Sequence, residues 1–231
     1  MKAKPYFLLF LLAMAVCLII GCRSGNKPAG PETGETTDVR ADQVSEAETD
    51  ESFSGGTGKP LGVRSGIIEY TYSGDKTGKS TQYFDDYGMK SAVYAEITTR
   101  GESSKGWSLT LGEDQYMWDL NSSQGMKAKN PMAKMLMDGS GGDIMAIMAD
   151  MDGQMGMQQS GTEMFQGKEC TVFKGDIGKV LIWKGLMMMM EMKMGEMVSR
   201  QEATSIRTNV NVDGKYFRIP GNITFNEIPV F

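Results

Sequence analysis

Hydrophobic and polar residues alternate with a period of two over much of the chain after residue 60. Ile68, Tyr70 and Tyr72 alternate with Glu69 and Thr71. Further alternating stretches follow at 80–84, 89–98, 107–111 and 116–120. This period is typical of half-buried β-strands, and the glycine-rich stretches between them indicate turns. The pattern therefore predicts an antiparallel meander, in which each strand pairs with the next one along the chain.

The pattern changes between residues 130 and 160. Asn130 followed by Pro131 is a favourable helix start, because asparagine caps a helix well and proline is tolerated in its first turn. Asp143 can cap a second helix. In that helix Ile144, Ile147, Met148 and Met151 fall at positions i, i+3, i+4 and i+7, which makes one apolar stripe.

Alternation returns in the C-terminal third of the chain. Strands are predicted at 168–173, 179–183, 186–194 and 202–212, and a terminal stretch, 217–228, is interrupted by Pro220 and Gly221. The predicted layout is a meander, a helical interruption and a second meander. This layout favours a single, mainly β domain of the α+β class.

The N-terminal region has the features of a bacterial lipoprotein precursor. Residues 1–21 combine Lys2 and Lys4 with an uncharged apolar run, which predicts a signal peptide because the run is short for a membrane span. The following Ile19-Ile20-Gly21-Cys22 resembles the lipoprotein box, in which the cysteine becomes the lipidated N-terminus. That resemblance implies lasting membrane attachment through Cys22, since each buried methylene contributes about 0.8 kcal/mol.

Residues 22–60 are predicted to be a disordered tether. They contain several proline, glycine, serine and glutamate residues but a single aromatic residue, Phe53. Eight acidic side chains lie between Glu32 and Glu51, so the tether carries most of the formal charge of -5. The remaining domain, 61–231, is close to neutral, which argues against a nucleic-acid partner.

Candidate catalytic chemistry is scarce. The chain has no histidine, so the commonest general base and metal ligand is missing. Cys170 is the one cysteine outside the signal peptide and lipoprotein box, which excludes an intramolecular disulfide in the domain. Its place on a predicted strand indicates a small buried side chain. We therefore expect no catalytic residues, no cofactor and a protein that is not an enzyme.

Methionine is unusually frequent, with 21 residues, and several of them lie in the strand predicted over 186–194. On a strand, Met188, Met190, Met192 and Met194 share a face with Leu186. The opposite face would carry Met187, Met189, Glu191 and Lys193, and the two charges indicate that it faces water.

Three interpretations of the methionine face compete. Flexible thioether side chains fill irregular cores, they can line a cavity for acyl chains, and they are suitable soft ligands for copper(I). A solid core would make the domain a purely structural module. For copper the better candidate is a loop, because mobile methionines at short spacing are favoured there; its members are Met151, Met155, Met157 and Met164.

The combination of lipoprotein box, acidic tether, early meander from Gly66, central helices and second meander resembles the superfamily of LolA- and LolB-like lipoprotein carriers. The resemblance covers about residues 61–231 and is one of layout. It implies a strongly curved antiparallel sheet or incomplete β-barrel, capped by one or two helices, with a hollow for lipid chains. The helix stripe from Ile144 to Met151 would form the lid, and Met188 to Met194 the facing wall.

These features together predict a lipid-anchored cell-envelope protein that binds lipid or lipoprotein acyl chains without catalysis. The residues after Cys22 are Arg-Ser-Gly, and the lack of an acidic residue there favours sorting to the periplasmic side of the outer membrane. The expected partners are the membrane and a lipid or lipoprotein ligand, and the oligomeric state stays open.

Overall fold

The computed structural model describes residues 59–130 and 156–228. The predicted signal peptide, Cys22 and the tether lie outside the described residues. So do both predicted helices. In the described ranges the chain forms strands and two short 3-10 helices, and no α-helix.

The first meander contains six strands. They are β1 (Gly66–Gly74), β2 (Lys76–Asp85), β3 (Lys90–Thr99), β4 (Glu102–Leu111), β5 (Asp114–Asp119) and β6 (Gln124–Lys129), with the 3-10 helix η1 (Asp86–Gly88) between β2 and β3. Each pairs antiparallel with the next. The alternation in the sequence thus predicted the first five strands and their order.

The second meander contains five strands, followed by a C-terminal segment. The strands are β7 (Met157–Phe165), β8 (Lys168–Gly175), β9 (Gly178–Trp183), β10 (Leu186–Met194) and β11 (Met197–Thr208), and the segment holds the 3-10 helix η2 (Gly214–Phe217) and strand β12 (Thr224–Glu227). Neighbouring strands again pair antiparallel.

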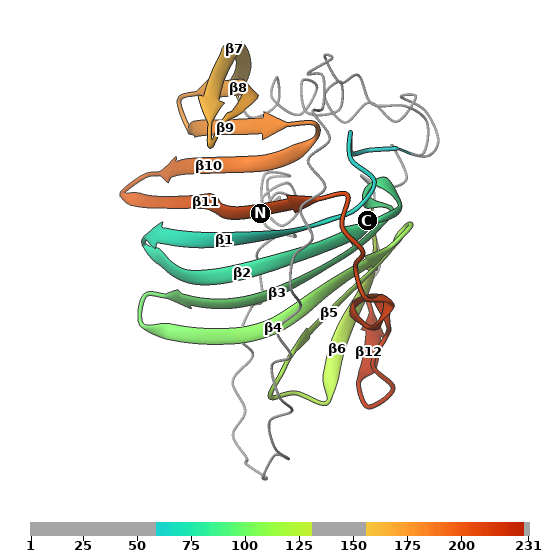
Figure 1. The fold of residues 1–231 in the computed structure, drawn as a ribbon. Helices are drawn as coiled ribbons and strands as arrows, with labels where there is room; N and C mark the ends of the chain where they lie inside the picture. The colour runs from blue at the N-terminus through green and yellow to red at the C-terminus, as the bar shows by residue number, and fades with distance from the viewer. Residues whose placement is uncertain (1–58, 131–155, 229–231) are drawn as a thin grey trace.

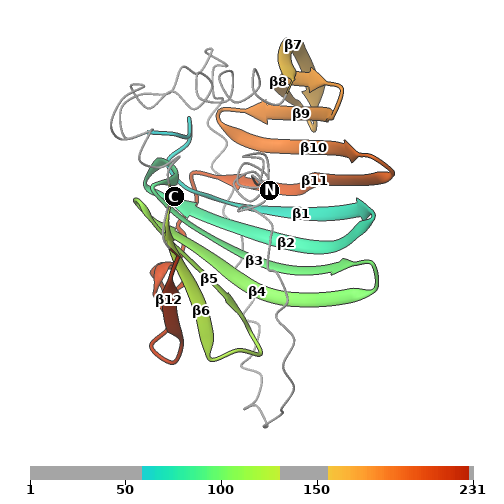
Figure 2. The same ribbon diagram turned by 180° about the vertical axis from the view of Figure 1, so that it is seen from behind.

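The two meanders form one open sheet. Antiparallel pairing of β1 with β11 joins them, and the order is β12-β6-β5-β4-β3-β2-β1-β11-β10-β9-β8-β7. Strand β12 is the exception in direction, because it pairs parallel with β6. The sheet is strongly twisted: β5, β6 and β12 run steeply relative to β1–β4, and the β7–β8 hairpin turns away at the other end (Figure 1). Figure 2 shows the same arrangement from behind.

The central core lies where the two meanders meet. Ile68, Tyr70 and Tyr72 of β1 are buried in it, so the face predicted for this strand is confirmed. Phe84 of β2 and Met188 of β10 are fully buried in the same core. Burial of these large apolar side chains contributes about 1.5–3 kcal/mol each, which makes the β1–β11 junction a main source of stability.

A second core, the aromatic cluster, occupies the opposite face of β3–β6. By the pairing register Leu109 lies opposite Ala92 on β3 and Tyr116 on β5. Its members are Tyr83, Ala92, Trp107, Leu109, Leu111, Tyr116, Trp118, Tyr216, Phe217 and Phe225. The last three belong to the C-terminal segment, which therefore covers this face of the sheet (Figure 1).

Some element predictions are wrong in position. Strand β11 begins at Met197 and ends at Thr208, whereas a strand over 202–212 was expected. Strands β6 and β7 were not predicted. The polar sequence of β7, MQQSGTEMF, lacks the alternation that marks other strands; it is an edge strand whose residues from Gln158 to Met164 are exposed. Exposed edge strands need no apolar face.

Within residues 59–130 and 156–228, no helix has the length and hydropathy required to cross a bilayer.

Candidate ligand-binding face

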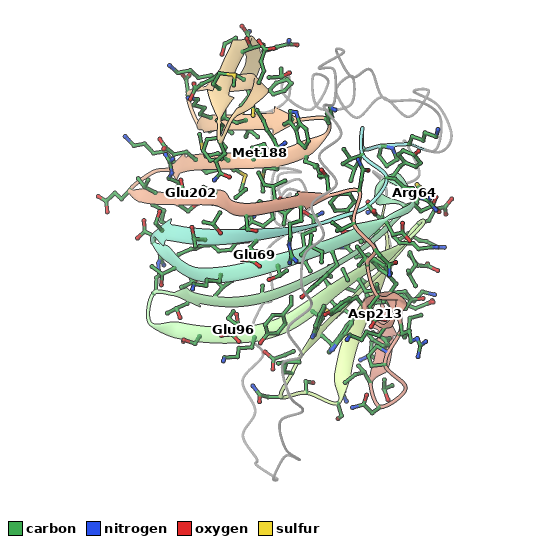
Figure 3. All side chains as sticks on the ribbon, viewed as in Figure 1. Arg64, Glu69, Glu96, Met188, Glu202 and Asp213 are labelled. Atoms are coloured by element: carbon green, nitrogen blue, oxygen red, sulfur yellow. The ribbon has the colours of Figure 1, made fainter. Side chains whose placement is uncertain are left out.

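Strand β10 carries the methionine run, and strands pair with it on both sides. Met190 lies between Gln201 of β11 and Val180 of β9. Met188, labelled on β10 in Figure 3, is fully buried, whereas Met190 and Met192 are partly exposed. The exposure of the methionine side chains therefore increases along β10, from the buried Met188 to the partly exposed Met190 and Met192.

A β-bulge alters the predicted separation of the two faces. The register of β10 against β9 shifts between Met187 and Met189, so that Met188 is an extra residue. The prediction that Met187 and Met189 face water is wrong, because Met189 is only 3% exposed and Met187 is partly buried against both cores. Glu191 and Lys193 are exposed, as expected. The predicted common face of Leu186 and Met190 is also wrong, because Leu186 pairs with Trp183 of β9 and Met190 with Val180, three residues away and on the other face of that strand. The first half of β10 is thus apolar on both faces.

A compact group of apolar side chains from β7, β8 and β9 adjoins this face. We call it the methionine cluster; its buried members are Met157, Phe173, Val180 and Ile182, and Ile177, Met187 and Met190 pack against them. The unbranched members can adopt several rotamers at small cost. The cluster consequently combines the rigid side chains of Phe173, Val180 and Ile182 with flexible thioethers, Met187 and Met190, that pack against them.

Hydroxyl groups of β1 and β2 pair with buried polar atoms, and one of them reaches the bulge of β10. The Tyr70 hydroxyl lies 3.0 Å from the Met187 carbonyl oxygen and 3.2 Å from the Gln82 Oε1. The Tyr72 and Ser80 hydroxyls lie 3.0 Å apart. Buried polar groups are costly when unpaired, so the contact of Tyr70 with the Met187 carbonyl stabilises the bulge that positions Met188. The sequence pattern identified both tyrosines as strand residues but did not predict this polar role.

The other face of the same hairpin is charged. The Arg200 guanidinium lies 3.2 Å from a carboxylate oxygen of Glu191 and 2.8 Å from one of Glu202. Hydrogen bonding to Glu202, followed by Glu191, raises the pKa of Arg200 above its ordinary value. These ion pairs are solvent-exposed and individually weak. They nevertheless separate a charged face of β10 and β11 from the methionine face.

The predicted lid cannot be placed against this wall, since Ile144, Ile147, Met148 and Met151 lie outside the described residues. Met194 is described only by its backbone, which pairs with Met197 of β11. The hollow between lid and wall therefore stays a prediction.

The loop expected to hold copper is not a loop where the chain is described. Met157 and Met164 both lie on β7. Met157 is buried in the methionine cluster, whereas Met164 is 64% exposed. Met151 and Met155 lie outside the described residues. The two described thioethers differ in environment and belong to opposite ends of one strand, so the loop hypothesis is wrong for this pair.

Cys170 is fully buried in the central core, as expected. Burial, and to a smaller degree the nearby Glu163, raises the pKa of its thiol to about 11. The thiol is therefore protonated at neutral pH, and a protonated thiol is a poor nucleophile. Among residues 59–130 and 156–228, no three His, Cys, Asp or Glu side chains are grouped as metal ligands.

No model of a protein family and no curated protein matches the chain. Among solved structures, an uncharacterised conserved protein from Thermus thermophilus is similar with a TM-score of 0.45 and 8% identity, over 70% of this chain and 90% of that one. MucB in complex with MucA(peri) has a TM-score of 0.35 and 11% identity, over 68% of this chain and 55% of MucB. LprF from Mycobacterium bovis has a TM-score of 0.33 and 9% identity, over 67% of this chain and 90% of LprF.

Proposed function

We propose that this protein is a non-catalytic, lipid-anchored component of the bacterial cell envelope that binds acyl chains of lipids or lipoproteins against the methionine face of β10. The observation that carries the proposal is the graded exposure of this face. Met187 and Met190 pack against the methionine cluster and, like Met192, are partly exposed, whereas Met188 is fully buried in the central core.

Binding on this face would be driven by desolvation. Transfer of an acyl chain from water onto apolar side chains is favourable by about 25 cal/mol for each Å² removed from water. An acyl chain brings no hydrogen-bonding groups, and thioethers can repack around chains of different length. The face therefore suits a class of ligands better than a single rigid molecule.

The proposed lipid anchor indicates whether the protein would act at one membrane or move between membranes. Lipidation at Cys22 would hold the protein at one membrane, which we propose is the periplasmic face of the outer membrane. A permanently attached protein acts as a receptor or local acceptor, whereas a soluble shuttle must leave the membrane. A flexible tether of about forty residues would reach roughly 35 Å on average, enough to hold the domain clear of the lipid surface.

Mass spectrometry of lipid that co-purifies with the full chain, followed by titration of a fluorescent fatty acid, tests the proposal. Met190→Glu and Met192→Glu should weaken the binding of the fatty acid by about tenfold or more, because a carboxylate is costly beside an acyl chain. Met164→Glu is the matched control, since Met164 is already exposed on the edge strand β7.

Equal binding by all three variants would contradict the proposed face. Absence of both co-purified lipid and fatty-acid binding would leave the structural-module alternative, in which the methionines merely complete a solid core.

A further inference from the structure

Two tight turns lie at the same end of the second meander. Gln166-Gly167 joins β7 to β8, and Lys184-Gly185 joins β9 to β10. All four residues have positive φ, which is typical of type I′ hairpin turns. Thr171 of β8 pairs with Ile182 of β9, and continuing this register places Lys168 beside the second turn. The sheet therefore brings Lys168 close to Lys184.

The side chains of both lysines contact one indole ring. The Nζ atom lies 3.8 Å from the centroid of the Trp183 ring for Lys168 and 5.2 Å from it for Lys184. The two ammonium groups are consequently no further apart than the sum of these distances. Cation–π attraction holds each of them at the ring, although like charges repel one another. We infer that Lys168 and Lys184 form a binding site for a phosphate group, which would lie between the two ammonium groups.

The surroundings of the ring favour an anion. Trp183 is only 4% exposed and is buried in the central core, so apolar side chains and not water lie beneath the ammonium groups. Repulsion between two charges beside such a core is screened less than in bulk water, and an anion between them would remove it. Lys168 and Lys184 are themselves partly exposed, so the anion can approach from solvent.

The carboxylate that follows Lys168 in the chain does not neutralise its charge. Glu169 is the next residue on β8, so its side chain lies on the other face of the strand. Its carboxylate accepts a hydrogen bond of 2.9 Å from the Thr162 hydroxyl of β7. Within residues 59–130 and 156–228, no carboxylate forms an ion pair with Lys168. Its charge is thus available to a ligand.

Hydrogen bonds hold both turns in place. The Gly62 amide donates to the Lys184 carbonyl at 2.8 Å. The Gln166 side-chain amide donates to the Ala203 carbonyl of β11. Both turns are therefore attached to neighbouring segments before a ligand arrives. Binding would require the reorientation of two lysine side chains but no rearrangement of the backbone, which lowers its entropic cost.

The donor type indicates which anion suits the site. An ammonium group is a compact charge with three donors on a flexible stem, and lysine is a common phosphate ligand. Phosphate oxygens can accept hydrogen bonds from both lysines at once. A phosphodiester of a lipid headgroup and a free phosphate share this chemistry. The site goes beyond the proposed function and shares no residue with the acyl-chain face of Met187, Met190 and Met192.

Phosphorus NMR titrations of the full chain, with inorganic phosphate and separately with glycerophosphoglycerol, the deacylated headgroup of a phospholipid, test the site. The buffer contains little salt, because salt screens exposed charges. Lys168→Gln with Lys184→Gln should weaken binding by about tenfold or more, since the charge-assisted hydrogen bonds are lost. Lys174→Gln with Lys193→Gln is the matched control: it removes the same charge from exposed lysines near the other ends of β8 and β10, and binding should be unchanged.

A second double variant, Lys168→Arg with Lys184→Arg, should keep the binding, because both charges are retained. Tighter binding of glycerophosphoglycerol would assign the site to a lipid headgroup, and tighter binding of inorganic phosphate would assign it to a free phosphate. Binding of neither anion, or equal binding by the glutamine variant and the starting protein, overturns the inference. The fatty-acid experiments change other residues, so their failure would leave this result standing.

Discussion

The two ends of the sheet are stabilised by different kinds of side chain. In the aromatic cluster the rings of Tyr83 and Tyr216 stack with centroids 3.9 Å apart and planes 12° apart. Trp107 and Trp118 lie nearly parallel, with centroids 6.4 Å apart. In the methionine cluster, Met187 and Met190 instead pack as flexible chains against Phe173 and its neighbours.

The two clusters differ in how many side-chain arrangements they allow. Aromatic rings have few rotamers and preferred mutual orientations, so each ring of the C-terminal segment has one favourable place on β3–β6. Thioether chains have three rotatable bonds and fill whatever space is offered. The aromatic cluster thus holds the C-terminal segment in one position on the sheet. The thioether side chains at the edge of the methionine cluster can instead change rotamer and repack.

The largest expected effect comes from creating one cavity in the aromatic cluster and one in the central core at Met188, beside Met187, which packs against both the central core and the methionine cluster. Leu109 and Met188 are both fully buried, and replacing either by alanine should lower the free energy of unfolding by about 2–5 kcal/mol. Leu109→Ala should lie in the upper half of this range, because rigid rings around it cannot close the gap. Met188→Ala should lie in the lower half, since Met187 can move in.

Urea unfolding followed by circular dichroism measures both values. Equal losses, or a larger loss for Met188→Ala, would contradict the distinction between a rigid and an adaptable region.

An intermediate effect is expected at high pH in the aromatic cluster. Burial, followed by the neighbouring Tyr216, raises the pKa of Tyr83 from its ordinary value of 10.0 to about 12. Since the neutral ring is favoured in the folded state, this contribution to stability is complete below pH 10.0 and is lost as the pH rises toward about 12.

Urea unfolding at several pH values in this window, with tyrosinate absorbance in parallel, measures the loss. Burial, followed by the hydrogen bond to Glu96, also raises the pKa of Tyr94 to about 12, so Tyr83→Phe should reduce the pH dependence but not abolish it. An unchanged pH dependence in Tyr83→Phe would show that Tyr83 does not contribute.

The smallest effect is expected on the charged side of the β10–β11 hairpin. Arg200→Gln removes its contacts with Glu191 and Glu202, whose side chains are 49% and 37% exposed. Such exposed ion pairs contribute about 0–1 kcal/mol. The loss in free energy of unfolding should be below about 1 kcal/mol and should shrink with added salt. A loss above about 2 kcal/mol would indicate that these pairs, and not the apolar side chains, hold the hairpin together.

Alternation predicted strands well wherever one face is buried and the other is wet. The strand predicted over 186–194 has those bounds in the structure, and the apolar face of Ile68, Tyr70 and Tyr72 is confirmed. Two kinds of strand lack this pattern. Strand β7 is exposed on both faces from Gln158 to Met164 at the sheet edge, and β12 has only four residues. Neither is marked by a difference in burial along its sequence.

The candidate site shows the same division. The positions of Met188, Met190 and Met192 on one strand could be predicted from spacing alone. The burial of Met189 could not, because it depends on the bulge at Met188 and on Leu181, its partner on β9. The opposition of Met194 and Met197 likewise requires the register of the hairpin.

By itself the sequence determined the local structure: two meanders and the strand that carries the methionine run. These follow from the period of side chains along an extended backbone, which is a local property. The tertiary structure alone decided that β1 pairs with β11, that the C-terminal segment covers β3–β6, and that Met187 and Met190 pack against the methionine cluster. Such pairings join residues far apart in the chain, and their free energy comes from packing and register that no single stretch encodes.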